Sequence, residues 1–197
     1  MNGRKFSMLA AILVLAAAIV AHRVEALHAD EDGITLASLA GGFAVSDSGI
    51  GTFCVGGCAA PTKLVPFNSI HVGQVTFDGA GNYCGVLTAV GLPVAGSSKL
   101  LPAGAATFAG TVTAFDPITQ SGDITHTIYD GGSCSGAVFN GNGATIGGTV
   151  TAKIVVSQNA NHLAFAARFA PATGSDPHGG NFFLGAFDRQ NFQHEDH

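Results

Sequence analysis

Two histidines are the residues whose type and position best suit chemistry in this sequence. His71 lies on the same alternate positions as Phe77, and His126 lies between Ile124 and Ile128 in a similar alternation. In a β-strand such positions project to one face, so both imidazoles are expected on the apolar side of their strands. A polar side chain in these surroundings is either a hydrogen-bonded core residue or the anchor of a ligand in an apolar pocket. The residues alone leave both interpretations open.

Other apolar positions on the same strands complete an expected pocket. The residues assigned to ligand binding are His126, His71, Phe108, Ile124, Ile128, Phe165 and Phe169. Val112 and Ile154 are expected in the same wall, and the small residues Ala152 and Ala167 would leave room opposite the phenylalanines. The expected occupant is a small apolar molecule. No catalytic residue, metal or cofactor is assigned.

The four cysteines predict disulfides. Cys54, Cys58, Cys84 and Cys134 are an even number, which in an exported chain suits two bridges with three possible connectivities. Cys54 and Cys58 could close a small loop, and Cys84 and Cys134 could meet across a sheet, since each follows a Gly-rich turn. The rival interpretation is zinc, but a C-x3-C spacing without a second matching pair is a poor zinc pattern.

Residues 1–26 have the features of a secretory signal peptide. Arg4 and Lys5 precede an apolar run over residues 8–21, which is shorter than the ~20 residues of a membrane-spanning helix. Small residues at Val24 and Ala26 predict cleavage after Ala26, and an uncleaved anchor is the alternative. The mature chain is therefore expected in the periplasm or outside the cell.

The composition excludes several classes of protein. The chain has 197 residues and a net charge of −5, and only 11% of its residues are charged, so it lacks the basic surface of a nucleic-acid-binding protein. A barrel of the outer membrane would carry girdles of Trp and Tyr, whereas this chain has no Trp and two Tyr. We therefore expect no nucleic-acid partner and no membrane span in the mature chain.

The elements that would hold the histidines are short strands. Alternating β-prone segments separated by Gly, Asn, Asp and Pro predict an all-β fold, a single antiparallel up-and-down β-barrel of about eight strands, with a two-sheet sandwich as the alternative. The expected organisation is a lead-in at 27–40, a barrel domain at 41–190 and a polar tail at 191–197. The candidate strands are 42–46, 51–55, 71–77, 83–90, 106–114, 123–129, 135–139, 149–156, 163–170 and 181–187.

Two connections can be predicted in more detail. The glycines and Asn82 after Phe77 favour a tight hairpin turn over a calcium loop. The strands 149–156 and 163–170 are expected to pair, with Val156 opposite Phe165. That register also places Lys153 opposite Arg168, an unfavourable contact between like charges.

Three segments resemble exported bacterial barrels of the calycin class, which includes the lipocalins. They are Leu39–Ser46 as the opening strand, Gly73–Asn82, and Ile128–Gly136. Phe43 follows Gly42 where lipocalins carry a Gly-x-Trp motif. The resemblance implies a barrel able to hold an apolar ligand, and it carries over no catalytic residue.

These observations favour an exported, non-catalytic barrel that binds a small apolar molecule. The first alternative is a structural or surface-interaction protein whose barrel is filled by its own side chains. The second is a barrel enzyme of the cyclase type, in which His71 or His126 would need a second polar group beside it inside the barrel.

Overall fold

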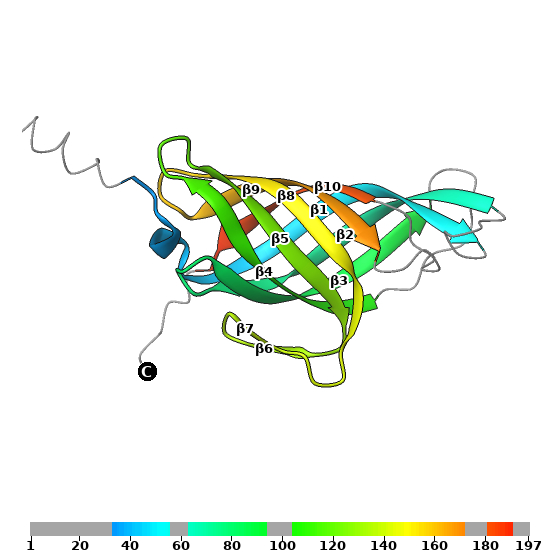
Figure 1. Cartoon of the computed structure of the whole chain (residues 1–197). Helices are drawn as coiled ribbons and strands as arrows, with labels where there is room; N and C mark the ends of the chain where they lie inside the picture. The colour runs from blue at the N-terminus through cyan, green and yellow to red at the C-terminus, as the bar shows by residue number, and fades with distance from the viewer. Residues whose placement is uncertain (1–32, 56–62, 94–103, 172–180, 191–197) are drawn as a thin grey trace, which may run out of the picture. The chain divides into compact units, whose positions relative to one another are not determined.

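In a computed structural model of the chain, residues 33–55, 63–93, 104–171 and 181–190 are described. They form a closed antiparallel barrel, and the all-β barrel prediction is confirmed (Figure 1). Around the barrel the strand order is β1-β10-β9-β8-β5-β4-β3-β2. The strands are β1 (Gly41–Val55), β2 (Lys63–Phe77), β3 (Asn82–Pro93), β4 (Gly104–Asp116), β5 (Ser121–Asp130), β8 (Thr145–Val156), β9 (His162–Pro171) and β10 (Asn181–Arg189). The expected signal peptide, the polar tail and Cys58 lie outside the described residues.

The strand expected at 135–139 is not part of the barrel. Its residues belong to a hairpin of two short strands, β6 (Ser133–Ser135) and β7 (Val138–Asn140), which pair only with each other (Figure 1). The ring of Tyr129 on β5 stacks on Phe139, with 4.1 Å between the ring centroids. The β-prone residues of this segment thus form a hairpin that packs beside the barrel wall.

The barrel is strongly staggered. The stagger is found by stepping from each residue to its paired residue on the next strand around the barrel. Starting at Phe77 on β2, these steps pass through His126 on β5 and reach Asn181 on β10. Asn181 adjoins Gly51 on β1, and the partner of Gly51 on β2 is Phe67. One circuit of the barrel therefore returns to β2 at Phe67, ten residues from Phe77, where it began. The corresponding stagger in a TIM barrel is about eight. Because stagger, tilt and diameter are linked, this barrel is the wider of the two at the same strand number.

Inward-facing glycines give the aromatic side chains their space. A Cβ built on Gly85 would lie 2.4 Å from the Phe108 ring, and a Cβ on Gly49 would lie 2.4 Å from the Phe183 ring. The same close approach occurs between Gly148 and Phe169, between Gly185 and Phe165, and between Gly110 and the His126 Cβ. Four phenylalanine rings therefore lie against bare backbone on the neighbouring strand, which gives these glycines a packing role.

The two ends of the barrel differ in their connections. One end carries the tight turns β2–β3, β4–β5 and β8–β9, together with a 3-10 helix, Leu36–Leu39, that precedes β1 (Figure 1). Arg189 at the end of β10 donates hydrogen bonds to the carbonyl oxygens of Ser38, Ala40 and Ala160, and it stacks over the Phe43 ring. Leu39, Phe43 and neighbouring side chains are almost fully buried here. This end of the barrel is consequently filled.

The turn between β2 and β3 has the predicted hairpin form. The Asp78 carboxylate accepts hydrogen bonds from the backbone N–H groups of Ala80 and Asn82 and from the Asn82 side chain. These bonds, the one from the Asn82 side chain above all, lower the pKa of Asp78. Gly79 and Gly81 both have positive φ, which a glycine adopts without strain. The Asp78 carboxylate is thus hydrogen-bonded by residues of its own turn.

The predicted register of β8 and β9 is wrong by two residues. Val156 pairs with Leu163, and Ile154 pairs with Phe165. The turn is tighter than expected, because the Ser157 N–H donates to the His162 carbonyl and Ala160 adopts a positive φ. A shift of two residues leaves every side chain on its expected face. It also removes the unfavourable pair, since Lys153 lies opposite Ala166 and forms an ion pair with Asp123 on β5.

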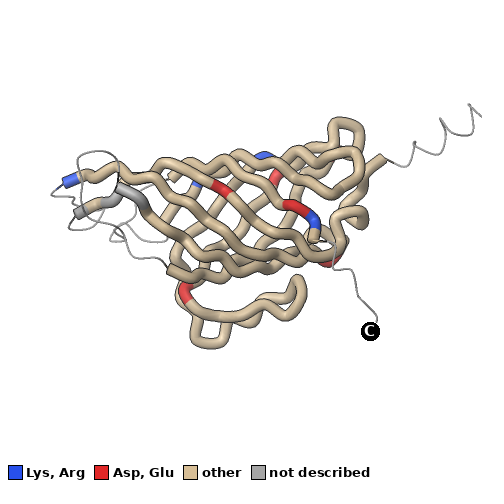
Figure 2. The backbone as a smooth tube through the Cα atoms, turned by 180° about the vertical axis from the view of Figure 1, so that it is seen from behind, with Lys and Arg blue, Asp and Glu red and all other residues tan. Residues whose placement is uncertain are grey.

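Charged side chains are sparse along the described part of the chain (Figure 2). No helix within the described residues is long and apolar enough to cross a membrane. Several large apolar side chains are exposed on the outer face of the barrel, including Ile50, Phe182 and Leu184.

Candidate functional site

A cavity of about 230 Å3 lies inside the barrel, away from the filled end. Its walls contain all seven residues that the sequence assigns to ligand binding, brought together from β2, β4, β5 and β9. The remaining lining residues are Val45, Asp47, Leu87, Ala89, Ala106, Val150, Ala167, Asn181, Phe183 and Phe187. Val112 and Ile154, also expected in this wall, are buried in the core and do not line the cavity. Ala152 is buried as well and lies outside the lining, whereas Ala167 is part of it.

The first polar group in the cavity is a pair formed by His71 and Asp47. The two residues are directly opposite each other on β2 and β1, and His71 Nδ1 lies 2.6 Å from Asp47 Oδ1. Their side chains are 14% and 9% exposed, and the His71 ring contacts Phe183 edge to face. The carboxylate therefore fixes the orientation of the imidazole and leaves Nε2 as its free nitrogen among the described contacts.

The second polar group is His126, which is held by Tyr83. His126 Nδ1 lies 2.9 Å from the Tyr83 hydroxyl oxygen, and Tyr83 is only 1% exposed. Burial lowers the pKa of His126 from 6.5 to about 3, because a charged imidazole would lose its hydration there. Burial likewise raises the pKa of Tyr83. At neutral pH both side chains are uncharged.

The tautomer of His126 follows from the need to satisfy Tyr83. A buried hydroxyl hydrogen needs an acceptor, and among the described residues His126 Nδ1 is the partner of this hydroxyl. We therefore assign the Tyr83 O–H as the donor and Nδ1 as the acceptor, which places the imidazole proton on Nε2. Tyr83 does not line the cavity, so the bonded edge of the ring points away from it and the Nε2 edge faces it. Within the described contacts this N–H has no acceptor.

Sequence reasoning missed Asp47 and Tyr83, the partners of both histidines. The strand expected at 42–46 ends one residue before Asp47, whereas β1 continues to Val55. Extending the alternation of Phe43 and Val45 by one step would have placed Asp47 on the inner face. Tyr83 was recognised only as the beginning of a strand.

No protein-family model matches the chain. No curated protein is significantly similar to it either. Function is therefore inferred from the geometry of the site. That geometry combines a mostly apolar cavity with two oriented imidazoles, which is the usual composition of a small-molecule site.

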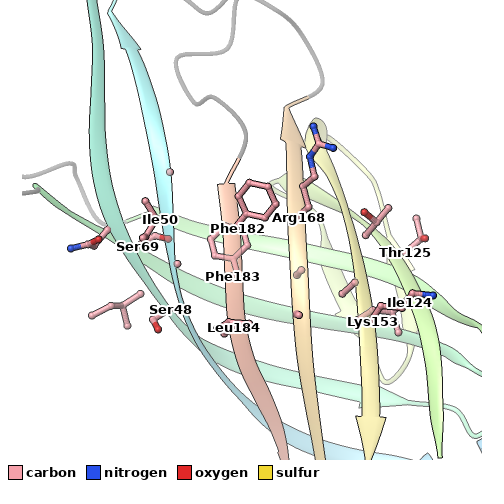
Figure 3. Close-up of a pocket in the computed structure, with 18 of the residues that line it drawn as sticks. Ser48, Ile50, Ser69, Ile124, Thr125, Lys153, Arg168, Phe182, Phe183 and Leu184 are labelled. Carbon is pink, nitrogen blue, oxygen red and sulfur yellow. The ribbon is translucent and has the colours of Figure 1, made fainter. Parts of the chain in front are cut away.

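A larger depression, about 1300 Å3, lies on the outer surface across the barrel strands around β1, β10 and β9. Figure 3 shows Phe182, Leu184 and Arg168 at this surface. Phe182 and Leu184 are 66% and 69% exposed, so this depression is shallow and open to solvent. It contains neither histidine pair of the cavity, and the internal cavity is the better candidate site.

One predicted disulfide is present, and it holds the β6–β7 hairpin. Cys84 on β3 is bonded to Cys134 on β6, so the bridge joins the barrel wall to the hairpin and not two barrel strands. Cys54 is also disulfide-bonded, and its expected partner Cys58 lies outside the described residues. The described cysteines thus contain no free thiol that could act as a nucleophile.

Proposed function

We propose that this protein is an exported barrel that binds a small apolar molecule in its internal cavity. The observation that carries the proposal is that all seven side chains predicted to line a pocket meet at one cavity of about 230 Å3. A cavity of 150 Å3 lined by apolar side chains is known to bind benzene, so this volume suits a ligand of about ten non-hydrogen atoms. The volume of about 230 Å3 is just below the ~300 Å3 of a typical drug-sized site.

The cavity favours this proposal over the structural alternative. A purely structural barrel would be filled throughout by its own side chains, as the end around Leu39 and Phe43 is. Here the alanines at 89, 106 and 167 leave the middle of the barrel open. The resemblance to exported calycin-like barrels, which implies an apolar ligand, belongs to the same proposal.

Export is the second part of the proposal. It depends on the predicted signal peptide at residues 1–26 and is supported by the Cys84–Cys134 bridge, because disulfides persist in oxidising compartments. The compartment is then the periplasm or the exterior of the cell.

Thermal unfolding in the presence of n-propylbenzene tests binding directly. A ligand at ten times its Kd should stabilise the folded protein by about 1.4 kcal/mol, which raises the Tm by about 3–5 °C at this chain length. Ala167→Leu puts three more carbon atoms into the cavity and should abolish the shift. The matched control is Ala166→Leu, on the exposed face of the same strand, which should retain it. A shift that survives Ala167→Leu, or no shift in the native protein at saturating ligand, would contradict binding in this cavity.

A second candidate, a cyclase-type enzyme, is favoured by one observation. Each cavity histidine has a second polar group beside it, His71 with Asp47 and His126 with Tyr83. An imidazole oriented by a carboxylate is suited to move a proton on a bound substrate. The test is to incubate the ligand recovered from the host protein with the native chain and with His71→Phe. Conversion to an isomer by the native chain alone would establish the enzyme, and an unchanged ligand in both would exclude it for that ligand.

A further inference from the structure

Two features of the cavity restrict the chemistry of its ligand more narrowly than apolarity does. The first is the unpartnered Nε2–H of His126, and the second is the charge balance of the lining. Both concern the binding function proposed above and depend on it.

His126 presents a hydrogen-bond donor to a cavity whose other polar lining residues are Asp47, His71 and Asn181 among those described. Its ring is packed against Phe108, with 5.1 Å between the centroids, and its Nδ1 is occupied by Tyr83. Gly110, its partner on β4, leaves no room for a Cβ because the Thr125 carbonyl oxygen and the Cα and Cβ atoms of His126 occupy that position. The hydrogen bond to Tyr83 and the packing against Phe108 together fix the orientation of the ring. Among the described contacts the Nε2–H has no protein acceptor, so a ligand that accepts this hydrogen bond inside the cavity gains over one that does not.

The lining offers no compensation for an anionic ligand. Among the described lining residues Asp47 is the only carboxylate, and its Oδ1 already contacts His71 Nδ1. No Lys or Arg is found among the described residues that line the cavity. A ligand carboxylate would place a second negative charge near Asp47 in a space with little water, which is unfavourable. The low pKa of His126 means that this ring cannot supply the missing positive charge at neutral pH.

We propose that the natural ligand is a neutral molecule of about ten non-hydrogen atoms with one hydroxyl or carbonyl oxygen, which accepts a hydrogen bond from His126 Nε2. Its apolar part packs against the phenylalanines and small residues of the lining, including Phe165, Phe169 and Ala167. Carboxylic acids and other anions of the same size are excluded as good ligands by the charge balance.

Three compounds with one carbon skeleton test this inference: n-propylbenzene, 3-phenylpropan-1-ol and 3-phenylpropanoate. Their dissociation constants are measured at neutral pH for the native protein and for the double variant Tyr83→Phe/His126→Phe. The double variant removes both partners together, so that no buried hydroxyl is left unpaired. His162→Phe, which changes an exposed histidine on β9, is the matched control.

In the native protein the alcohol should bind about tenfold or more tightly than the carboxylate. The double variant should weaken the alcohol about tenfold relative to propylbenzene, whose own affinity should change by less than about twofold. The control should leave both ratios unchanged. Should the double variant prove unstable, His126→Gln is measured in its place. Because glutamine keeps a donor, this variant is expected to lose less than half of the preference for the alcohol over propylbenzene, expressed as the logarithm of the ratio of dissociation constants.

The outcomes separate the inference from the function on which it depends. If propylbenzene binds but the ratio of alcohol to propylbenzene is the same in both proteins, the inference about the oxygen is wrong and the binding function stands. If the carboxylate binds most tightly, the argument from charge is wrong. If none of the three compounds binds the native protein, the proposed function itself is contradicted.

Discussion

In the described part of the barrel, two histidine–aspartate pairs have the same contact distance but different surroundings. Nδ1 of His71 and Nδ1 of His162 each lie 2.6 Å from a carboxylate oxygen on the neighbouring strand, that of Asp47 and of Asp188 respectively. The inner pair is 14% and 9% exposed, whereas the outer pair is 51% and 59% exposed. Contact distance alone therefore does not distinguish them.

The difference between the pairs lies in what surrounds them. Water and salt screen the outer pair, so its contribution to stability is small and its imidazole is one of many solvated groups. The inner pair borders an apolar cavity, where an unpaired polar atom is costly and a free imidazole nitrogen is available to a ligand. The same two residue types form a surface contact in one place and a candidate recognition element in the other.

Removing each carboxylate should show this difference most strongly. Asp47→Ala leaves His71 without its partner inside the barrel and should lower the free energy of unfolding by about 3 kcal/mol. Asp188→Ala should lower it by less than about 1 kcal/mol. Both values come from denaturant unfolding at neutral pH, and equal losses in the two variants would refute the distinction.

Acid should destabilise the protein through His126 and not through exposed histidines. The folded-state pKa of His126, about 3, is below its ordinary value of 6.5, so the unfolded chain takes up a proton that the folded chain does not. Stability is therefore unaffected above about pH 6.5 and falls below it by up to ~1.4 kcal/mol per pH unit, or about 2–3 kcal/mol by about pH 4.5.

Two variants check the origin of this slope in unfolding experiments. The double variant Tyr83→Phe/His126→Phe should lose most of the decline between about pH 6.5 and 4.5. His162→Phe should retain it, because that side chain is exposed on the outer face. A decline that persists unchanged in the double variant would mean that His126 is not buried in its neutral form.

Much of the cavity could be predicted because strands have a simple period. Alternation alone placed His71, His126 and five apolar side chains on inner faces, and closure of the barrel brought those faces together. The partners of the histidines could not be found in this way. Asp47 depends on how far β1 extends, and the bond between Tyr83 and His126 joins strands that are two apart in the barrel.

The remaining errors have local physical causes. The register of β8 and β9 was wrong because the turn after Ser157 is closed by its own backbone and side-chain hydrogen bonds, which residue type alone does not specify. The segment around Cys134 has the composition of a strand, but composition does not specify whether a strand pairs within the barrel or within a separate hairpin. Its attachment by the Cys84–Cys134 bridge is a long-range feature.

Methyl NMR of isoleucine-labelled mature protein, titrated with n-propylbenzene, tests the central claim most directly. Ile124 and Ile128 line the cavity, whereas Ile118 and Ile146 are 90% and 61% exposed. The account predicts saturable shifts of the δ1-methyl resonances of Ile124 and Ile128, with Ile118 and Ile146 unchanged. No saturable shift at Ile124 and Ile128, or shifts of equal size at all four residues, would contradict a ligand site inside the barrel.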